Sequence, residues 1–163
     1  MLNQIEFIVT RPKASHKDIQ LFEASLRVKL PAEFKEFCER FNGGCPSWKN
    51  NYYPVPNRFA GFRTEYGVGL KHIGVSVQDL LGILPEDDRF SISKKTKFYE
   101  LHRKPFSNTI PVGTDGSGNT FLIRTGDRNF GEVSFFDNET EETYPIAERY
   151  DELFNGLRPR PEE

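Results

Sequence analysis

Apolar residues recur at helical spacing in a first stretch near the N-terminus. Ile19, Phe22 and Leu26 follow one another at intervals of three and four residues, which places them on one face of a helix. Ser15 precedes them as a good N-cap, and Asp18 stands at the third helical position, where a carboxylate faces unpaired amide groups. The pattern predicts an amphipathic helix that begins after Ser15 and ends before the next proline, because proline disfavours helical geometry in the residue ahead of it.

A second amphipathic helix is predicted directly after the first. Pro31 suits its first position, where the missing backbone N–H is harmless. Three rings and one thiol fall at the spacing i, i+3, i+4, i+7 and share one face: Phe34, Phe37, Cys38 and Phe41. Asn42-Gly43-Gly44 supplies a glycine for a left-handed cap, so we expect the helix to end there.

The middle of the chain shows weaker patterns. Residues 47–74 alternate aromatic residues with proline and glycine, which predicts irregular chain with one or two short strands. Ser76 is predicted to cap a short helix that runs through Leu81. A further helix is predicted over residues 91–104, although its apolar residues fit the helical period only loosely.

The pattern changes to that of β-strands after Asn108. Short apolar runs are separated there by the turn-forming sequences DGSGN, GDRNFG and DNETEE, which predicts an antiparallel meander. The predicted strands are Ile110–Val112, Phe121–Ile123, Val133–Phe136 and Thr143–Ile146. A closing helix is predicted from Ala147 to Leu157.

Helices first, a run of strands next and a helix last indicate an α+β fold. The expected architecture is a single antiparallel sheet of about four to six short strands, packed with two N-terminal helices and a C-terminal helix. The 163 residues suit one domain over residues 1–163, with a core over 15–157 and a frayed tail at 158–163. Fifteen Phe, six Tyr and one Trp indicate that aromatic rings fill much of the core.

The net charge and the cysteine content indicate which cellular compartment and which classes of partner to expect. The formal net charge of −2 and the pI near 6.0 give no basic footprint, so no direct nucleic-acid binding is expected. Two cysteines make no disulfide framework, and we recognise neither a signal peptide nor a membrane-spanning run, so we expect a cytoplasmic protein that does not enter a membrane. Residues 89–104 carry six cations and one anion, whereas residues 132–163 carry ten acids and three arginines, a polarity that can steer a partner.

The DGSGN turn is the first candidate for ligand chemistry. Counted from Asp115, a calcium-binding EF-hand loop would place oxygen ligands at Asp115, Ser117 and Asn119, but its twelfth position is Gly126 instead of glutamate. A phosphate-binding glycine loop opens a helix, and a strand is predicted here. We therefore expect a hairpin turn that holds neither a metal ion nor a nucleotide.

Other reactive groups do not assemble into a site. His16, His72 and His102 lie far apart, without a partner at the ligand spacing of zinc sites. Cys38 is expected in the core and Cys45 in the loop beyond, and neither shows the nearby histidine that a catalytic thiol needs. No serine stands in a Gly-x-Ser-x-Gly elbow. Hence we expect no enzyme, with no catalytic residue, cofactor or metal.

Two groups of residues are candidates for contacts with a partner. Large aromatic residues on irregular surface are typical anchors of protein interfaces, and the aromatic candidates are Trp48, Tyr52 and Tyr53. The other interpretation, that these rings cap the core, is slightly favoured. The acidic candidates are Glu139, Glu141 and Glu142.

Several short motifs occur in order over residues 15–157. They are Leu30-Pro31 before the Phe-rich helix, the Asn42-Gly43-Gly44 break, Ile110-Pro111, the Asp115–Asn119 turn, Gly131-Glu132-Val133 and the helix from Tyr150 to Leu157. This ordered set resembles the SUKH superfamily, which is named partly for yeast regulators of cell-wall (glucan) synthesis and includes many bacterial immunity proteins. No motif that we recognise covers residues 47–105, the variable part of such proteins.

The resemblance implies a binding protein without catalytic groups. The leading hypothesis is a cytoplasmic immunity protein that neutralises a cognate toxin by direct binding. Its acidic residues 132–152 would mimic a phosphate backbone toward a basic nuclease, or its basic residues 89–104 would meet an acidic partner. The alternatives are a regulator or scaffold of cell-wall synthesis without a toxin partner and, less favoured, a small-ligand binder or enzyme that uses residues 47–74. Both a monomer and a homodimer are compatible with the sequence.

Overall fold

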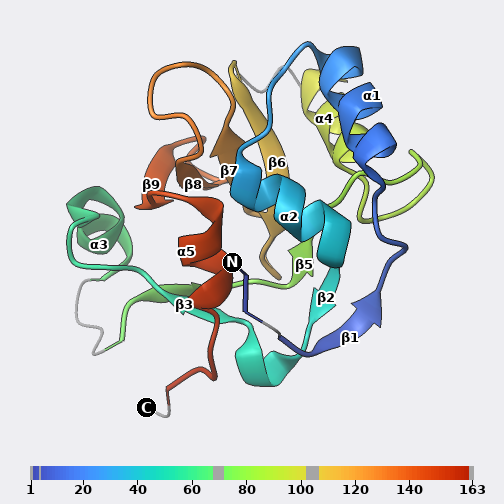
Figure 1. The fold of residues 1–163 in the computed structure, drawn as a ribbon. Coiled ribbons are helices and arrows are strands. Elements are labelled where there is room, and N and C mark those ends of the chain that lie inside the picture. The colour runs from blue at the N-terminus through green and yellow to red at the C-terminus, as the bar shows by residue number, and fades with distance from the viewer. Residues whose placement is uncertain (1, 4, 68–71, 102–106, 162–163) are drawn as a thin grey trace.

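The computed structural model describes residues 2–3, 5–67, 72–101 and 107–161 of the chain. Helices surround a central sheet (Figure 1). The helices are α1 (His16–Leu26), α2 (Ala32–Arg40), α3 (Ala60–Tyr66), α4 (Ile92–Leu101) and α5 (Tyr150–Asn155), and Trp48–Asn50 forms a short 3-10 turn, η1. The strands are β1 (Phe7–Thr10), β2 (Gly44–Pro46), β3 (Tyr52–Pro54), β4 (Gly74–Ser76), β5 (Asp79–Leu80), β6 (Thr109–Thr114), β7 (Thr120–Arg124), β8 (Val133–Phe136) and β9 (Thr143–Ala147).

One antiparallel sheet organises the molecule. Its strands lie in the order β1-β2-β5-β6-β7-β8-β9, and a separate two-stranded sheet pairs β3 with β4. The α+β class and the meander β6–β9 are confirmed, but the large sheet has seven strands instead of the four to six expected. The strands that were not predicted, β1, β2 and β5, are two to four residues long. Such short segments carry no periodic pattern, and they become strands because distant neighbours pair with them.

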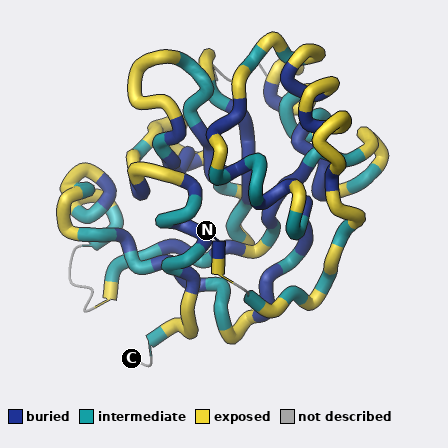
Figure 2. The backbone as a smooth tube through the Cα atoms, viewed as in Figure 1, coloured by how far each residue is buried: buried dark blue, intermediate teal, exposed yellow. Residues whose placement is uncertain are grey.

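Different helices pack on the two faces of the sheet. Successive strand residues point to opposite faces, and the main core takes Phe121 of β7 and Phe135 of β8, together with buried side chains of α1, α2, α3 and α5. Their neighbours Thr120 and Phe136 point to the other face. There Tyr99 of α4 packs against Phe136 and shares a hydrogen bond with Thr120. The buried positions run through the centre of the sheet and the inner sides of the helices (Figure 2).

Aromatic rings fill the core, as predicted. Phe34 and Phe37 of α2 meet Tyr150 and Phe154 of α5, with ring centroids 4.9 to 5.6 Å apart. Ring pairs at these distances add about 0.5–1.5 kcal/mol each beyond the burial of apolar area. The Phe-rich face of α2 therefore holds the C-terminal helix in place.

The first two helices begin and end close to the predicted residues. Ser15 and Asp18 form a capping box, in which the Asp18 N–H donates to Ser15 Oγ at 3.2 Å and the Ser15 N–H donates to Asp18 Oδ2 at 2.8 Å. Pro31 is the N-cap of α2 rather than its first helical residue. Asn42 and Gly43, with φ of 54° and 92°, turn the chain out of α2.

Predictions for the middle of the chain are partly wrong. Ser76 caps no helix, because the predicted helical stretch forms β4 and β5. β4 pairs with β3, in a register that places Tyr53 opposite Val75, and no local pattern reveals this contact. Irregular chain with one or two short strands was expected over 47–74. β3 confirms a strand there, and the structure adds α3, anchored in the core by Phe62.

The later helices are shorter than predicted. The closing helix spans only Tyr150–Asn155, because β9 continues to Ala147 and pairs with Val133. The helix predicted over 91–104 is α4 up to Leu101, and residues 102–104 lie outside the described part of the chain. None of the helices in the described ranges is both long and apolar enough to cross a bilayer.

Candidate functional site

The Asp115–Asn119 turn joins β6 and β7 as a hairpin, as the sequence predicts. Asp115 Oδ1 accepts hydrogen bonds from the Ser117 N–H at 2.8 Å and the Asn119 N–H at 2.9 Å, and Asp115 Oδ2 accepts from Asn119 Nδ2 at 2.9 Å. Both carboxylate oxygens thus hold the turn. Asn119 Oδ1 accepts from the Asn138 N–H at 3.0 Å, which links this turn to the one between β8 and β9.

The histidines and the two cysteines were the other candidates for metal-binding or catalytic chemistry. Over the described residues, no three His, Cys, Asp or Glu side chains gather as metal ligands would. His16 and His72 are exposed, and His102 lies outside the described residues. Burial raises the pKa of the Cys38 thiol far above its ordinary value and also raises the pKa of Cys45. Neither thiol is therefore activated as a thiolate.

The three aromatic candidates do not share a surface. Tyr52 and Tyr53 of β3 are only 4% and 2% exposed. The Tyr53 hydroxyl donates to the Ile146 carbonyl at 3.2 Å, and the Tyr52 backbone pairs with Arg158. Both rings therefore pack inside the protein. Of the three, Trp48 alone offers its ring to a partner, since it is 70% exposed in η1.

The three acidic candidates lie together on the turn between β8 and β9, called the acidic hairpin below (residues 137–142). Glu139, Glu141 and Glu142 are all exposed. Asp137 Oδ1 accepts hydrogen bonds from the Glu139 N–H at 2.7 Å and from the next backbone N–H at 3.1 Å. The Asp137 N–H donates to the Glu142 carbonyl at 2.9 Å. One carboxylate and the backbone itself thus close the turn.

Two tyrosines hold the acidic hairpin from outside. The Tyr66 hydroxyl of α3 donates to Asp137, and the Tyr144 hydroxyl of β9 donates to Glu142. The two rings lie edge to face with centroids 5.5 Å apart, and both belong to an aromatic group with Phe62. The hydrogen bond from Tyr66 lowers the pKa of Asp137, and the hydrogen bond to Glu142 raises the pKa of Tyr144 to about 12. Asp137 is therefore ionised and Tyr144 protonated at neutral pH, which keeps the contacts intact.

Glu141 adopts a left-handed backbone conformation, with φ of 61°. This conformation costs a non-glycine residue about 1–2 kcal/mol, and glycine or asparagine usually occupies such positions. A glutamate at this point presents a carboxylate at the tip of the acidic hairpin at the expense of stability. The Glu141 N–H also donates to the Asp137 carbonyl at 2.9 Å, so this residue is part of the hydrogen-bonded turn.

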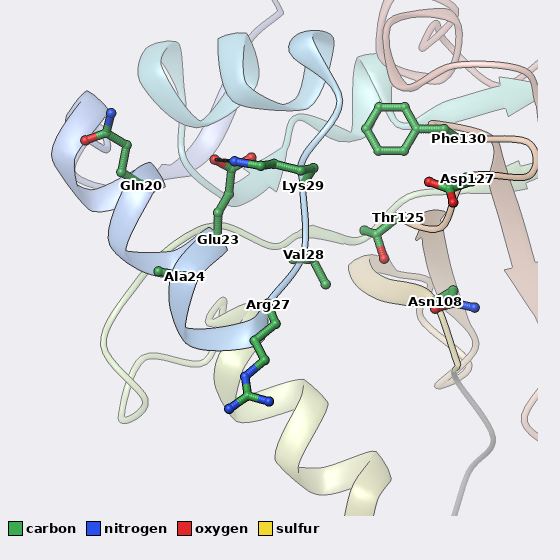
Figure 3. A pocket seen from close by; sticks show the side chains of 10 residues that line it. All are labelled: Gln20, Glu23, Ala24, Arg27, Val28, Lys29, Asn108, Thr125, Asp127 and Phe130. Carbon is green, nitrogen blue, oxygen red and sulfur yellow. Dashed lines mark ion pairs between the residues drawn. The ribbon is translucent and has the colours of Figure 1, made fainter.

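A hollow lies at the opposite end of the meander, between α1 and the loop that joins β7 to β8 (Figure 3). It holds about 870 Å³, within the size range of ligand pockets. Burial alone would raise the pKa of Glu23 on its wall, but hydrogen bonds from the Leu30 N–H and from Lys35, each at 2.8 Å, bring it below the ordinary value. This carboxylate thus holds the α1–α2 connection instead of being poised for proton transfer.

Sequence reasoning identified the three glutamates of the acidic hairpin but missed the residues that hold the hairpin in place. Asp137 had a usable signal, because an aspartate at the start of a turn often accepts backbone hydrogen bonds. Tyr66 and Tyr144 had none, since they reach the hairpin from other elements. Phe130, on the wall of the hollow, carried the signal of an aromatic residue set between Asn129 and Gly131 in a predicted turn.

Comparison with known proteins bears on nearly the whole chain. Residues 13–156 match the model of the SMI1 / KNR4 family (SUKH-1). No curated protein matches the chain. The matched range contains the five α-helices of the described residues, the acidic hairpin and the hollow. It agrees with the resemblance that the ordered motifs show.

Proposed function

Since the chain belongs to the SMI1 / KNR4 family (SUKH-1), we propose that it is a non-catalytic binding protein that neutralises a bacterial toxin by direct contact. The SUKH superfamily includes immunity proteins as well as cell-wall regulators, so the family supports binding in general. The choice of a toxin as partner is ours, and it draws on the shape and charge of the acidic hairpin.

The acidic hairpin is the single feature that carries the proposal. Its three exposed glutamates stand on a turn that Asp137, Tyr66 and Tyr144 hold in place. A turn that is already ordered loses little conformational freedom on binding, which favours affinity. Carboxylates at neighbouring positions of one turn resemble the regular negative charge of a nucleic-acid backbone.

The proposed mechanism is occlusion of a basic substrate channel. A nuclease toxin must bind phosphates with Lys and Arg side chains, and the acidic hairpin would occupy that channel in place of substrate. Exposed charges mainly raise the association rate, whereas desolvated aromatic rings supply most of the affinity. Trp48 is the aromatic candidate that the surface leaves available. We place this encounter in the cytoplasm.

The test is charge reversal of the acidic hairpin. The variant Glu139→Lys, Glu141→Lys, Glu142→Lys is mixed with the toxin encoded by the adjacent gene, and the association rate is measured at low and at physiological salt. We expect a loss of about tenfold or more at low salt and a smaller loss at higher salt, because salt screens exposed charges.

A matched control has the same change in net charge elsewhere. Glu6, Glu39 and Asp87 are also exposed and lie outside the acidic hairpin. Their reversal to lysine should change the rate by less than about threefold. If both triple variants slow association equally, or neither does, the acidic hairpin is not the contact. If the chain binds no toxin at all, the cell-wall regulator becomes the better hypothesis.

A further inference from the structure

The C-terminal segment passes beside β3 and brings two arginines to it (Figure 1). The Tyr52 N–H donates to the Arg158 carbonyl at 3.1 Å, and the Arg158 N–H donates to the Tyr52 carbonyl at 2.9 Å. Residues that face each other across such an antiparallel bridge direct their side chains to the same side of the sheet. Pro159 and Pro161 each keep the preceding arginine out of helical geometry, so Arg160 continues the extended course of the segment. Alternate residues of an extended segment point to the same side.

A third arginine reaches the same region from α3. Arg63 Nη1 donates to the carbonyl of Val55, the residue that follows β3, at 3.0 Å. This contact fixes the guanidinium beside the strand and uses only one of its N–H groups. The three side chains are called the arginine cluster below (Arg63, Arg158 and Arg160). Arg63 is half-buried, and the other two members are exposed.

The positive charge of the arginine cluster is not balanced by neighbouring acids. None of its members forms an ion pair with a residue that the structure describes. β3, β4 and residues 157–161 contain no Asp or Glu. Glu65 is the one acid of α3, and its charge acts on the two tyrosines that hold the acidic hairpin. Glu148 and Glu152 are paired with Arg58.

The Tyr52 side chain adds a buried donor to the arginine cluster. Tyr52 is 4% exposed, and its hydroxyl has no hydrogen-bond partner among the described residues. Burial raises the pKa of Tyr52 above its ordinary value, and the charges of the arginine cluster offset part of that rise. The hydroxyl is therefore protonated at neutral pH and lies within the electrostatic range of all three cations. Buried polar groups without a partner are rare and costly, and an anion held by the arginines would supply the missing acceptor.

The chemistry of this group fits a phosphorylated anion. Guanidinium N–H groups and a phenolic O–H are donors, and arginine pairs bidentately with phosphate. One phosphate carries about −1.5 to −2 charge at neutral pH, which leaves at least one of the three arginines unbalanced. Two linked phosphates carry about −3 and match the arginine cluster.

We infer that the arginine cluster and the Tyr52 hydroxyl bind the diphosphate group of a small phosphorylated ligand. Arg158 and Arg160 pair with phosphate oxygens from the C-terminal segment. Arg63 pairs with the same group from α3, and the Tyr52 hydroxyl donates to it from β3. The inference goes beyond the proposed function, because this site uses none of the residues of the acidic hairpin.

The experiment titrates inorganic pyrophosphate into the full chain at low salt and without magnesium. Calorimetry measures the affinity, and backbone amide chemical shifts of the isotope-labelled protein locate the site. We expect saturable binding with a Kd of about 1 mM or tighter, and shifts confined to residues 52–55, 60–66, 74–76 and 157–161. Orthophosphate, which carries less charge, should bind at least about fivefold more weakly. Citrate should also bind at least about fivefold more weakly, because a carboxylate offers two acceptor oxygens where a phosphate offers three.

Variants of the arginines identify the groups that bind. Arg158→Gln with Arg160→Gln should weaken pyrophosphate binding at least about tenfold, while the backbone bridge to β3 remains. The same two positions changed to lysine should give an intermediate affinity, because lysine keeps the charge and loses the bidentate contact. Arg27→Gln with Arg128→Gln is the matched control, since it removes two exposed arginines elsewhere and should change the affinity less than about twofold.

Tyr52→Phe tests the hydroxyl. Without ligand the variant should melt no lower than the parent, because the ring remains and the hydroxyl that is removed makes no hydrogen bond to the described residues. With pyrophosphate the variant should bind at least about threefold more weakly and gain less in melting temperature. Equal affinities of the two proteins would remove the hydroxyl from the site and contradict the inference.

Two further titrations define the ligand and its surroundings. ADP carries the same diphosphate group, so tighter binding of ADP than of pyrophosphate assigns the group to a nucleotide, and weaker binding assigns it to free diphosphate. Glu162 and Glu163 follow the cluster in the sequence and lie outside the described residues. Glu162→Gln with Glu163→Gln should bind pyrophosphate at least as tightly as the parent, because two negative charges are removed.

The outcomes are independent of the proposed function, because no toxin enters the titrations. Absence of saturable binding, scattered shifts, equal affinity for citrate or orthophosphate, or equal losses in the cluster variant and its control would each overturn the inference. Toxin binding through the acidic hairpin would then still stand. Specific pyrophosphate binding without toxin binding would remove the proposed function and keep the anion site.

Discussion

Individual residues with left-handed backbone angles lie on the acidic hairpin and at the hollow. Five non-glycine residues of the described chain have positive φ, and three of them are asparagines, which tolerate this conformation. The other two are Arg27, which is the C-cap of α1, and Glu141, whose N–H donates to the Asp137 carbonyl at 2.9 Å; both have long charged side chains. One lines the hollow and the other lies on the acidic hairpin. The coincidence of strain, charge and exposure is what separates these residues from ordinary surface positions.

Replacement of Glu141 by glycine should stabilise the protein and impair its function. Glycine adopts a φ near 61° without steric cost, so we expect the free energy of unfolding to rise by about 0.5–1 kcal/mol in urea titrations. Association with the toxin should slow at low salt, because one carboxylate is lost. A drop in stability would show that the glutamate side chain contributes to the fold.

Replacement of Tyr66 by phenylalanine should weaken the support of the acidic hairpin. The loss of the hydrogen bond to Asp137 should lower the free energy of unfolding at neutral pH by about 1–2 kcal/mol. The hydrogen bond lowers the pKa of Asp137 in the folded chain, so its contribution is present above the ordinary aspartate pKa of 3.8 and is lost as the pH falls through the lower folded value.

The two proteins should therefore differ most at neutral pH and converge in acid. Urea titrations of the parent and of Tyr66→Phe over a series of pH values measure this difference. A constant difference down to strongly acidic pH would mean that the effect comes from packing of the ring and not from the ionised carboxylate.

Secondary-structure elements at the edge of the sheet depend on close backbone contacts. β1 is joined to the sheet through β2, where Gly44 has φ of 130° and a side-chain carbon would come within 2.2 Å of the Val9 carbonyl oxygen. Only glycine fits this position. The pairing of β1 therefore depends on one residue more than on the hydrophobicity of the strand.

Replacement of Gly44 by alanine should detach β1. We expect a loss of stability of about 2 kcal/mol or more and faster hydrogen exchange at the amides of residues 7–10. Gly118→Ala is the matched control, since Gly118 has φ of 91° with open space around it and should cost only about 1 kcal/mol of backbone strain. Equal effects of the two substitutions would mean that the contact with Val9 is not decisive.

The molecule as a whole protects both edges of its large sheet. On β1 a register shift between Phe7 and Val9 leaves Ile8 in a bulge, and on β9 Pro145 lacks a backbone donor while α3 packs alongside. Bulges, prolines and covering helices are the usual means by which proteins prevent edge-to-edge pairing. Both edges are thus poor sites for a second copy to add its strands.

We therefore expect a monomer in solution. Sedimentation at micromolar concentration should give a mass near 18.8 kDa, and the mass should not depend on concentration or salt. A dimer that persists on dilution would show that a face other than the strand edges mediates self-association.

Sequence patterns over short stretches were sufficient to predict a large part of this protein's structure. The capping box of α1, the Phe-rich face of α2 and the four strands of the meander all follow from signals within about ten residues. The acidic turn and its three glutamates were readable for the same reason. Turn residues and side-chain periodicity act within a few residues, so the structure that they favour does not depend on the rest of the chain.

Long-range packing decided the remainder. β1, β2, β4 and β5 are strands only because distant segments pair with them. Tyr52 and Tyr53 are buried because β3 packs against parts of the protein that are remote in the sequence. Tyr66 reaches Asp137 across 71 positions in the chain. The hollow likewise exists only where α1 and the β7–β8 loop are brought opposite each other. Such contacts form through burial and hydrogen bonding between remote residues, and no periodic pattern records them.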